Sequence, residues 1–151
     1  MATFRGNHPA KVDEKGRLKL PAAFKQLMDT DGVKEFFITS TDGKRAEIWP
    51  LPEWEKVEAR LARAGSMDEA VEEFTNLVNY YGQQVEMDNQ GRVVLPQILR
   101  AKASLDGDVT VMGKLTYLAV NHRENFEKAL PLDGMQGEKL KKVADLLSDH
   151  E

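Results

Sequence analysis

Two pairs of side chains have the types and the spacing to hold a guanidinium group and present it to a ligand. Asp13 precedes Arg17 by four positions, and Asp88 precedes Arg92 by the same spacing. A carboxylate orients a guanidinium through charge-assisted hydrogen bonds, ideally in a bidentate ion pair. The oriented group is a planar donor that suits phosphate oxygens or the O6 and N7 atoms of guanine. The alternative is that each aspartate caps a turn and each arginine closes a structural salt bridge.

These pairs belong to an internal repeat. Residues 12–25 read VDEKGRLKLPAAFK, and residues 87–100 read MDNQGRVVLPQILR, at a constant offset of 75. The same offset aligns Asp31-Gly32 with Asp106-Gly107. Asp, Gly, Arg, Leu and Pro matched at one offset indicate a tandem duplication.

Each copy carries the signals of a turn, a strand, a short helix and a further hairpin. Asp-x-x-Gly is typical of a tight turn, and the alternating run 17–20 predicts a strand with one buried face. Pro21 and Pro96 stand where a helix naturally begins. The hairpins are expected at Glu35–Thr41 with Ala46–Trp49, and at Val109–Met112 with Tyr117–Val120.

Four more helices are expected between and after the repeats. The first spans Glu53–Ala64, and the second opens with a capping box at Ser66 and Glu69. In the second copy, Asn121 and Glu124 are expected to cap a helix that buries Phe126, Ala129 and Leu130. A last helix, Met135–Ser148, aligns the apolar residues Leu140, Val143, Ala144 and Leu147. Such stripes usually pack in the core, and a subunit interface is the alternative.

A unit of this size buries too little surface to be stable alone, so the two copies are expected to pack about a pseudo-two-fold axis. The predicted organisation is an α+β fold. It has a first module at 1–52, a helical connector at 53–81, a second module at 82–121 and C-terminal helices at 122–151.

Composition excludes several classes of function. The chain of 151 residues has no cysteine, so disulfides, thiolate metal sites and cysteine nucleophiles are excluded. No signal-peptide h-region and no apolar run near the roughly 18 residues of a membrane span occurs, so we expect a cytoplasmic protein without a membrane partner. Three scattered histidines and the lack of a glycine-rich phosphate loop predict no metal, no cofactor and no small-molecule substrate.

Charge is distributed unevenly along the chain. The net charge of −4 argues against a nucleic-acid binder, but residues 1–25 sum to +4 and the remaining residues to −8. This asymmetry indicates one face for a polyanion and another that repels it, with chance clustering as the alternative.

The motif Asp13-x-x-Gly16-Arg17-x-x-Leu20-Pro21, repeated from Asp88 to Pro96, resembles the MraZ family. The early Phe4-Arg5-Gly6 and the acidic helices after the first module extend the resemblance over nearly the whole chain. It implies two fused, pseudo-symmetric AbrB/MazE-like swapped-hairpin β-barrel modules with flanking helices, assembled as a closed homo-oligomeric ring. It also implies a nucleoid-associated transcriptional regulator that binds direct repeats of DNA upstream of its own operon, the division and cell-wall gene cluster.

The resemblance assigns DNA contact to the motif arginines, Arg17 and Arg92, beside their aspartates, Asp13 and Asp88. Phosphate contacts are expected from nearby cations of the first copy, namely Arg5, Lys11, Lys15 and Lys19. In the second copy Lys15 is replaced by Gln90 and Lys19 by Val94. We therefore expect the first copy to dominate DNA binding.

Three alternatives stay open. An enzyme would use Asp13 and Asp88 as paired carboxylates, although each lies beside its own arginine, which favours a structural role. An antitoxin-like or protein-interaction module would share the fold, but such proteins usually carry one module and a disordered tail. An RNA binder would be expected to interleave aromatic residues with the basic ones, and this chain does not.

Overall fold

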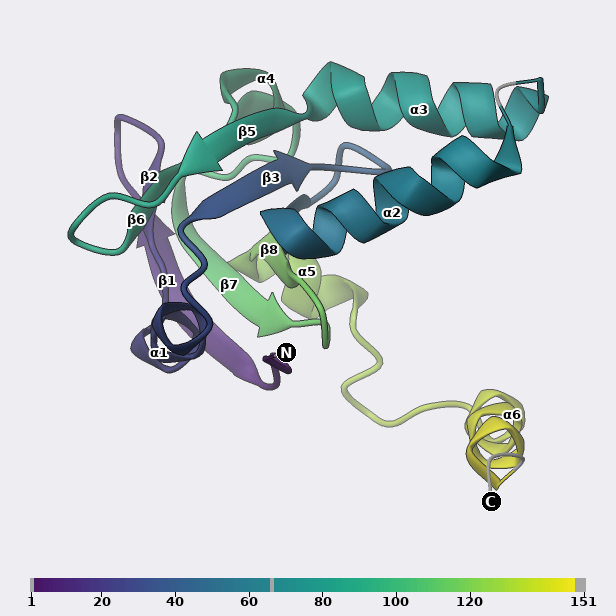
Figure 1. Ribbon diagram of the computed structural model, residues 1–151. Helices are drawn as coiled ribbons and strands as arrows, with labels where there is room; N and C mark the ends of the chain where they lie inside the picture. Colours follow the sequence, from purple (N-terminus) through teal and green to yellow (C-terminus); the bar gives the residue numbers. More distant parts are fainter. Residues whose placement is uncertain (1, 66, 149–151) are drawn as a thin grey trace.

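A computed structural model describes residues 2–65 and 67–148, and in this part of the chain eight strands form one antiparallel sheet (Figure 1). The first copy contains β1 (Asn7–Val12), β2 (Arg17–Lys19), α1 (Ala22–Thr30), β3 (Glu35–Thr39), β4 (Ala46–Pro50), α2 (Leu51–Ala64) and α3 (Glu69–Tyr81). The second contains β5 (Gln83–Glu86), β6 (Arg92–Val94), α4 (Gln97–Lys102), β7 (Gly107–Gly113), β8 (Leu118–His122), α5 (Arg123–Ala129) and α6 (Gly137–Ser148). The two copies therefore have the same order of elements.

The strands of the two copies interleave. The sheet order is β5-β3-β4-β8-β7-β1-β2-β6, so β1 of the first copy pairs with β7 of the second, and β5 of the second pairs with β3 of the first. The end strands β5 and β6 are consecutive in the chain, which curls the sheet into a near-barrel. The predicted α+β fold of swapped hairpins is thus confirmed, whereas the exact module bounds stay a prediction.

A pseudo-two-fold axis relates the copies. Leu18 on β2 pairs with Val93 on β6, its own equivalent at the offset of 75. Glu47 on β4 pairs with Ala119 on β8, where the offset has fallen to 72 because the second copy is shorter before its last strand. Equivalent positions also fill the shared core, which includes Leu18 and Val93, Leu20 and Leu95, and Phe24 and Leu99.

Helix ends differ from the sequence predictions. The carboxylate of Asp68 caps α3 by accepting from the backbone N–H groups of Ala70 and Val71, so the predicted capping box is wrong, and Ser66 lies outside the described residues. His122, rather than Asn121, caps α5, because its Nδ1 atom accepts from the Asn125 N–H at 3.1 Å. Side-chain caps depend on local backbone angles that composition does not specify.

The C-terminal helices are much less buried than predicted. Neither α5 nor α6 contains a buried residue. Of the three residues expected to be buried, Phe126 and Leu130 are only half-buried and Ala129 is exposed. The apolar stripe predicted for the last helix does form, but it faces solvent instead of the core. None of the described helices is long and apolar enough to cross a membrane.

Candidate nucleic-acid interface

The two Asp-x-x-Gly turns have the same backbone structure. In the first, the Gly16 N–H donates to the Asp13 carbonyl at 2.9 Å; in the second, the Gly91 N–H donates to the Asp88 carbonyl at 3.0 Å. The two glycines have φ angles of +79° and +76°, in the left-handed region that a side chain disfavours. The turns therefore need glycine, and each delivers its arginine to the first position of a strand.

Asp13 caps its turn and holds Arg17 at the same time. Its Oδ1 atom accepts from the backbone N–H groups of Lys15 and Arg17, both at 2.9 Å. Its Oδ2 atom accepts from Arg17 Nε at 2.7 Å. The predicted bidentate pair is thus replaced by a single side-chain bond. Among the described residues, the terminal Nη atoms of Arg17 have no hydrogen-bond partner, so the outer edge of the guanidinium can donate to a ligand.

The second copy repeats this arrangement. Asp88 accepts from the backbone N–H groups of Gln90 and Arg92, and from Arg92 Nε at 2.9 Å. The Arg17 and Arg92 side chains are 34% and 27% exposed, so both are held against the protein without being enclosed. We call each aspartate with its arginine a clamp.

Both clamp carboxylates are stabilised in the charged form. The backbone N–H of Arg17 is the main cause that lowers the pKa of Asp13, and the Arg17 side-chain hydrogen bond adds to it. The backbone N–H of Arg92 lowers the pKa of Asp88 in the same way. A carboxylate dyad that shares a proton has one raised pKa, so this direction disfavours the paired-carboxylate alternative.

The two clamps lie on one surface because β2 pairs with β6. In this register Arg17 is opposite Val94, and Lys19 is opposite Arg92. Leu18 and Val93 are buried beneath them, so the alternating residues Arg17, Lys19, Arg92 and Val94 form the outer face. We call this two-stranded surface with its adjoining turns the ribbon. Its turns lie at opposite ends, because the strands are antiparallel.

The cations around the ribbon belong mostly to the first copy. Lys15 and Lys19 are exposed there, and Lys11 is 82% exposed, with its Nζ 3.9 Å from Asp108. Residues 11–19 carry four cations and two carboxylates, whereas the equivalent residues 86–94 carry one cation and two carboxylates. Residues 11–19 are therefore net +2 and residues 86–94 net −1, although Lys19 lies across the ribbon from Arg92.

The structure does not bring Arg5 to the ribbon. It is exposed and precedes β1, whereas the Asp13 turn follows the other end of that strand. Six extended residues span about 20 Å, so Arg5 lies apart from the other predicted site residues.

Sequence reasoning missed the two residues that cover the turns. A Cβ atom added at Gly16 would overlap the Arg100 guanidinium, and one added at Gly91 would overlap the Lys25 side chain. The helix of each copy thus reaches over the turn of the other. Lys25 and Arg100 are equivalent in the repeat, and this shared basic character is the signal that could have identified them.

Comparison with known proteins places the chain among close relatives. The family model described as "MraZ protein, putative antitoxin-like" matches residues 3–77 and 82–136. The "Transcriptional regulator MraZ" of Acidobacterium capsulatum is 56% identical over 142 residues, which cover 94% of this chain and 97% of that protein. The protein of the same name from Koribacter versatilis is 44% identical, with 95% and 98% covered. That of Neisseria meningitidis serogroup C is 33% identical, with 82% and 83% covered.

Proposed function

The chain belongs to the MraZ family of transcriptional regulators, which are not enzymes, and from this premise we propose that it binds specific DNA through the ribbon. The observation that carries this proposal is the pair of clamps on one outer face. Each aspartate occupies the Nε atom of its arginine and leaves the Nη edge to donate. Such an edge can reach the O6 and N7 atoms of guanine in the major groove.

The first copy is proposed to dominate the contact. A two-stranded β-ribbon fits the major groove, and base readout needs a positioned multidentate donor, which is Arg17. Lys15 and Lys19 lie beside Arg17 and supply phosphate contacts. Such contacts strengthen DNA binding most where cations outnumber the nearby carboxylates. Arg92 has the same clamp and lies opposite Lys19, but its own turn carries Gln90 in place of Lys15, so its contribution is proposed to be smaller.

Assembly as a closed homo-oligomeric ring would offset the unfavourable net charge of −4. Each subunit repeats the basic end of the ribbon, and linked sites raise the effective concentration of every further contact. Head-to-tail subunits present their sites in the same direction, which suits direct repeats of DNA better than palindromes. The proposed target is such repeats upstream of the protein's own operon, the division and cell-wall gene cluster, in the nucleoid of the cytoplasm.

Binding to the DNA upstream of its own gene tests this proposal. The full chain is titrated against that duplex and against a shuffled duplex of equal composition, at several salt concentrations, with the oligomer mass measured by light scattering. We expect tighter binding to the upstream duplex, an affinity that falls with salt, and a mass of several subunits. Equal affinity for both duplexes would refute sequence-specific recognition.

The same purified chain and the same two duplexes test the antitoxin-like alternative. The family description contains that term, and it would be favoured if the chain co-purified with a partner protein in a fixed ratio and bound both duplexes equally. The half-buried, clamped arginines on one outer face, with their Nη edges unpaired among the described residues, favour DNA as the ligand.

A further inference from the structure

Helix α6 is the counterpart of α3 in the repeat, yet the two helices have different surroundings. Each follows the helix that succeeds the fourth strand of its copy. α3 buries Val78 and Tyr81, and the Thr39 hydroxyl donates to the Val78 carbonyl at 2.6 Å. α6 buries nothing and lies apart from the sheet (Figure 1), beyond residue 136, where the family model match ends. We therefore infer the role of α6 from its own residues and exposure.

The exposed face of α6 is an apolar stripe between two lysines. Leu140, Val143 and Leu147 are 54%, 42% and 71% exposed, and they share one side of the helix. With 3.6 residues per turn, Lys139 and Lys141 flank this stripe on its two sides. A stripe of this kind is typical of a helix that packs against another surface.

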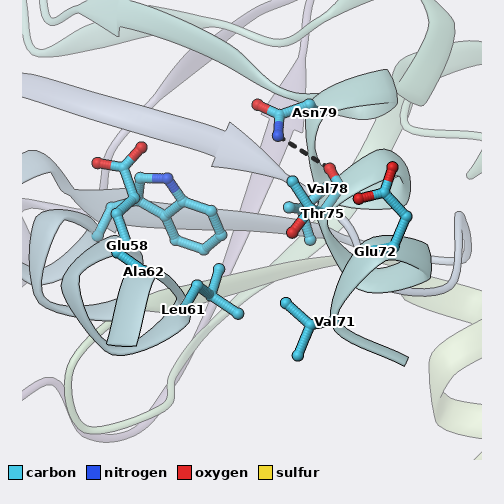
Figure 2. A pocket seen from close by; sticks show the side chains of 9 residues that line it. Glu58, Leu61, Ala62, Val71, Glu72, Thr75, Val78 and Asn79 are labelled. Atoms are coloured by element: carbon cyan, nitrogen blue, oxygen red, sulfur yellow. Dashed lines mark hydrogen bonds between the residues drawn. The ribbon is translucent and has the colours of Figure 1, made fainter. Parts of the chain in front are cut away.

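A groove of matching character lies between α2 and α3 (Figure 2). Trp54 and Val78 are buried within it, and Leu61 and Val71 face one another from the two helices. The groove is also lined by Glu58 from α2 and Glu72 from α3, both exposed. Helix α3 carries three carboxylates and no cation. The groove therefore offers an apolar floor and acidic sides to a basic amphipathic helix.

We propose that α6 of one copy docks into the α2–α3 groove of a neighbouring copy. Its stripe covers Leu61 and Val71, and its flanking lysines face Glu58 and Glu72. This is the helix-in-groove mode of recognition, with complementary charges fixing the orientation. Each copy has one α6 helix and one groove, so the contact is head-to-tail and propagates around a ring.

The neighbour, rather than the same subunit, is the chosen occupant because of the segment that precedes α6. Residues 130–136 lead α6 away from the sheet of its own chain, and Pro131 interrupts the helical path after α5. The inference rests on the proposed ring, since it identifies a contact between its subunits. It leaves the ribbon free for DNA, because the two surfaces share no residue.

Cysteine pairs test the contact directly, because the chain contains no cysteine of its own. Leu61→Cys is combined in turn with Leu140→Cys, Val143→Cys or Leu147→Cys, so that successive turns of α6 are sampled. Under mild oxidation we expect at least one pair to give a ladder of linked chains on a non-reducing gel. The matched control combines Leu61→Cys with Lys142→Cys, on the opposite face of α6, and is expected to give several-fold less ladder.

Other outcomes of this experiment would overturn the proposal. Internal disulfides within single chains would show that α6 fills the groove of its own subunit. No disulfide, or a ladder as strong in the Lys142 control, would show that the stripe does not occupy the groove.

A mass measurement separates this inference from the proposed function. Val143→Asp is expected to shift the assembly toward monomers, whereas Lys142→Asp keeps the wild-type mass. Mixing Val143→Asp with Glu58→Lys/Glu72→Lys chains should give dimers and nothing larger, since only one kind of contact can form. If Val143→Asp keeps the full mass and still binds DNA, the docking is wrong while the proposed function stands. If the wild-type chain is itself a monomer, the ring fails together with the docking.

Discussion

The two segments that build the ribbon, residues 11–19 and 86–94, have the same turn geometry and opposite net charge. Both turns close on a left-handed glycine, and both aspartates hold their arginine through Nε, at 2.7 Å and 2.9 Å. Yet the first segment carries net +2 and the second net −1. The shared features are what the fold requires of each copy, because each turn must connect two strands and leave no backbone group unpaired. The lysines are not required by the fold, so they indicate the segment that faces a polyanion.

The pairing of β2 with β6 makes this difference informative. A monomer with two identical ends would present a symmetric surface, suited to a symmetric ligand. Here Lys19 faces Arg92 across the ribbon, so one copy's lysine supports the other copy's arginine. The basic surface thus crosses the pseudo-axis, and the number of cations decreases toward Gln90 in the second turn. Substitutions at equivalent positions can therefore measure how much each end contributes.

The largest effect is expected from Arg17→Ala. It removes the proposed base-reading edge at the basic end, and a good bidentate contact contributes about 1–3 kcal/mol of discrimination, roughly 5- to 150-fold. The loss compounds where several subunits bind one duplex. Fluorescence anisotropy with the upstream and shuffled duplexes measures it, with circular dichroism and mass as controls for folding and assembly. Unchanged affinity for the upstream duplex would exclude Arg17 as the reader.

Arg92→Ala is expected to weaken specific binding less than Arg17→Ala does, by several-fold in the ratio of dissociation constants. Its guanidinium is clamped in the same way, so removing it is structurally matched to removing Arg17. What differs is the turn, which carries Gln90 where the first turn carries Lys15 and so offers one phosphate contact fewer. The same titration compares both variants side by side. An equal loss would mean that geometry, rather than local charge, decides which arginines contact DNA.

The repeat allowed much of the ribbon to be predicted from sequence. Asp-x-x-Gly predicted the turns, and the alternation of Arg17, Leu18 and Lys19 predicted the buried face. The offset of 75 made Leu18 and Val93 equivalent, whereas their pairing across β2 and β6 was found only in the structure. These features depend on neighbouring residues and on a symmetry that is visible in one dimension. The swapping of hairpins came only from the family resemblance, and the pairing of β1 with β7 was not predicted, because strand partners that lie far apart in the chain leave no local signal.

Other features could not be predicted because they depend on three-dimensional placement. The choice of Nε over a bidentate pair follows from where the turn places the Arg17 side chain relative to Asp13. The covering of Gly16 by Arg100 arises only once the helix of one copy crosses the turn of the other. The exposure of α6 was not predicted, because an apolar stripe has the same spacing in the sequence whether it packs in the core or faces solvent.

Lys15→Ala is expected to weaken binding to every duplex by a similar factor. Lys15 is exposed in the turn, and its backbone N–H, which the variant keeps, is what Asp13 binds. Loss of one phosphate contact reduces the slope of log affinity against log salt by about 1. Gln90→Lys adds a cation at the equivalent position of the second turn. It should steepen the salt slope if that turn also contacts DNA. A loss confined to the upstream duplex would mean that Lys15 reads bases.

The smallest effect is expected from acid on the free energy of unfolding. It tests whether the two clamps stabilise the fold to the same extent. The pKa of Asp13 is lowered chiefly by the backbone N–H of Arg17, and that of Asp88 by the N–H of Arg92. A carboxylate whose pKa is lower folded than unfolded stabilises the fold at every pH above its unfolded pKa of about 3.9. This stabilisation is lost as the pH falls through the lower, folded value.

Asp13→Asn keeps the Oδ1 acceptor for the turn but cannot accept a hydrogen bond from Arg17 Nε. Its difference from wild type in free energy of unfolding should therefore be constant from pH 8 to about pH 5 and shrink below about pH 4, as measured by urea unfolding. Asp88→Asn should behave in the same way, because both copies need the clamp and only one has the lysines. A pH dependence in one variant and not in the other would show that the copies differ in structure as well as in charge.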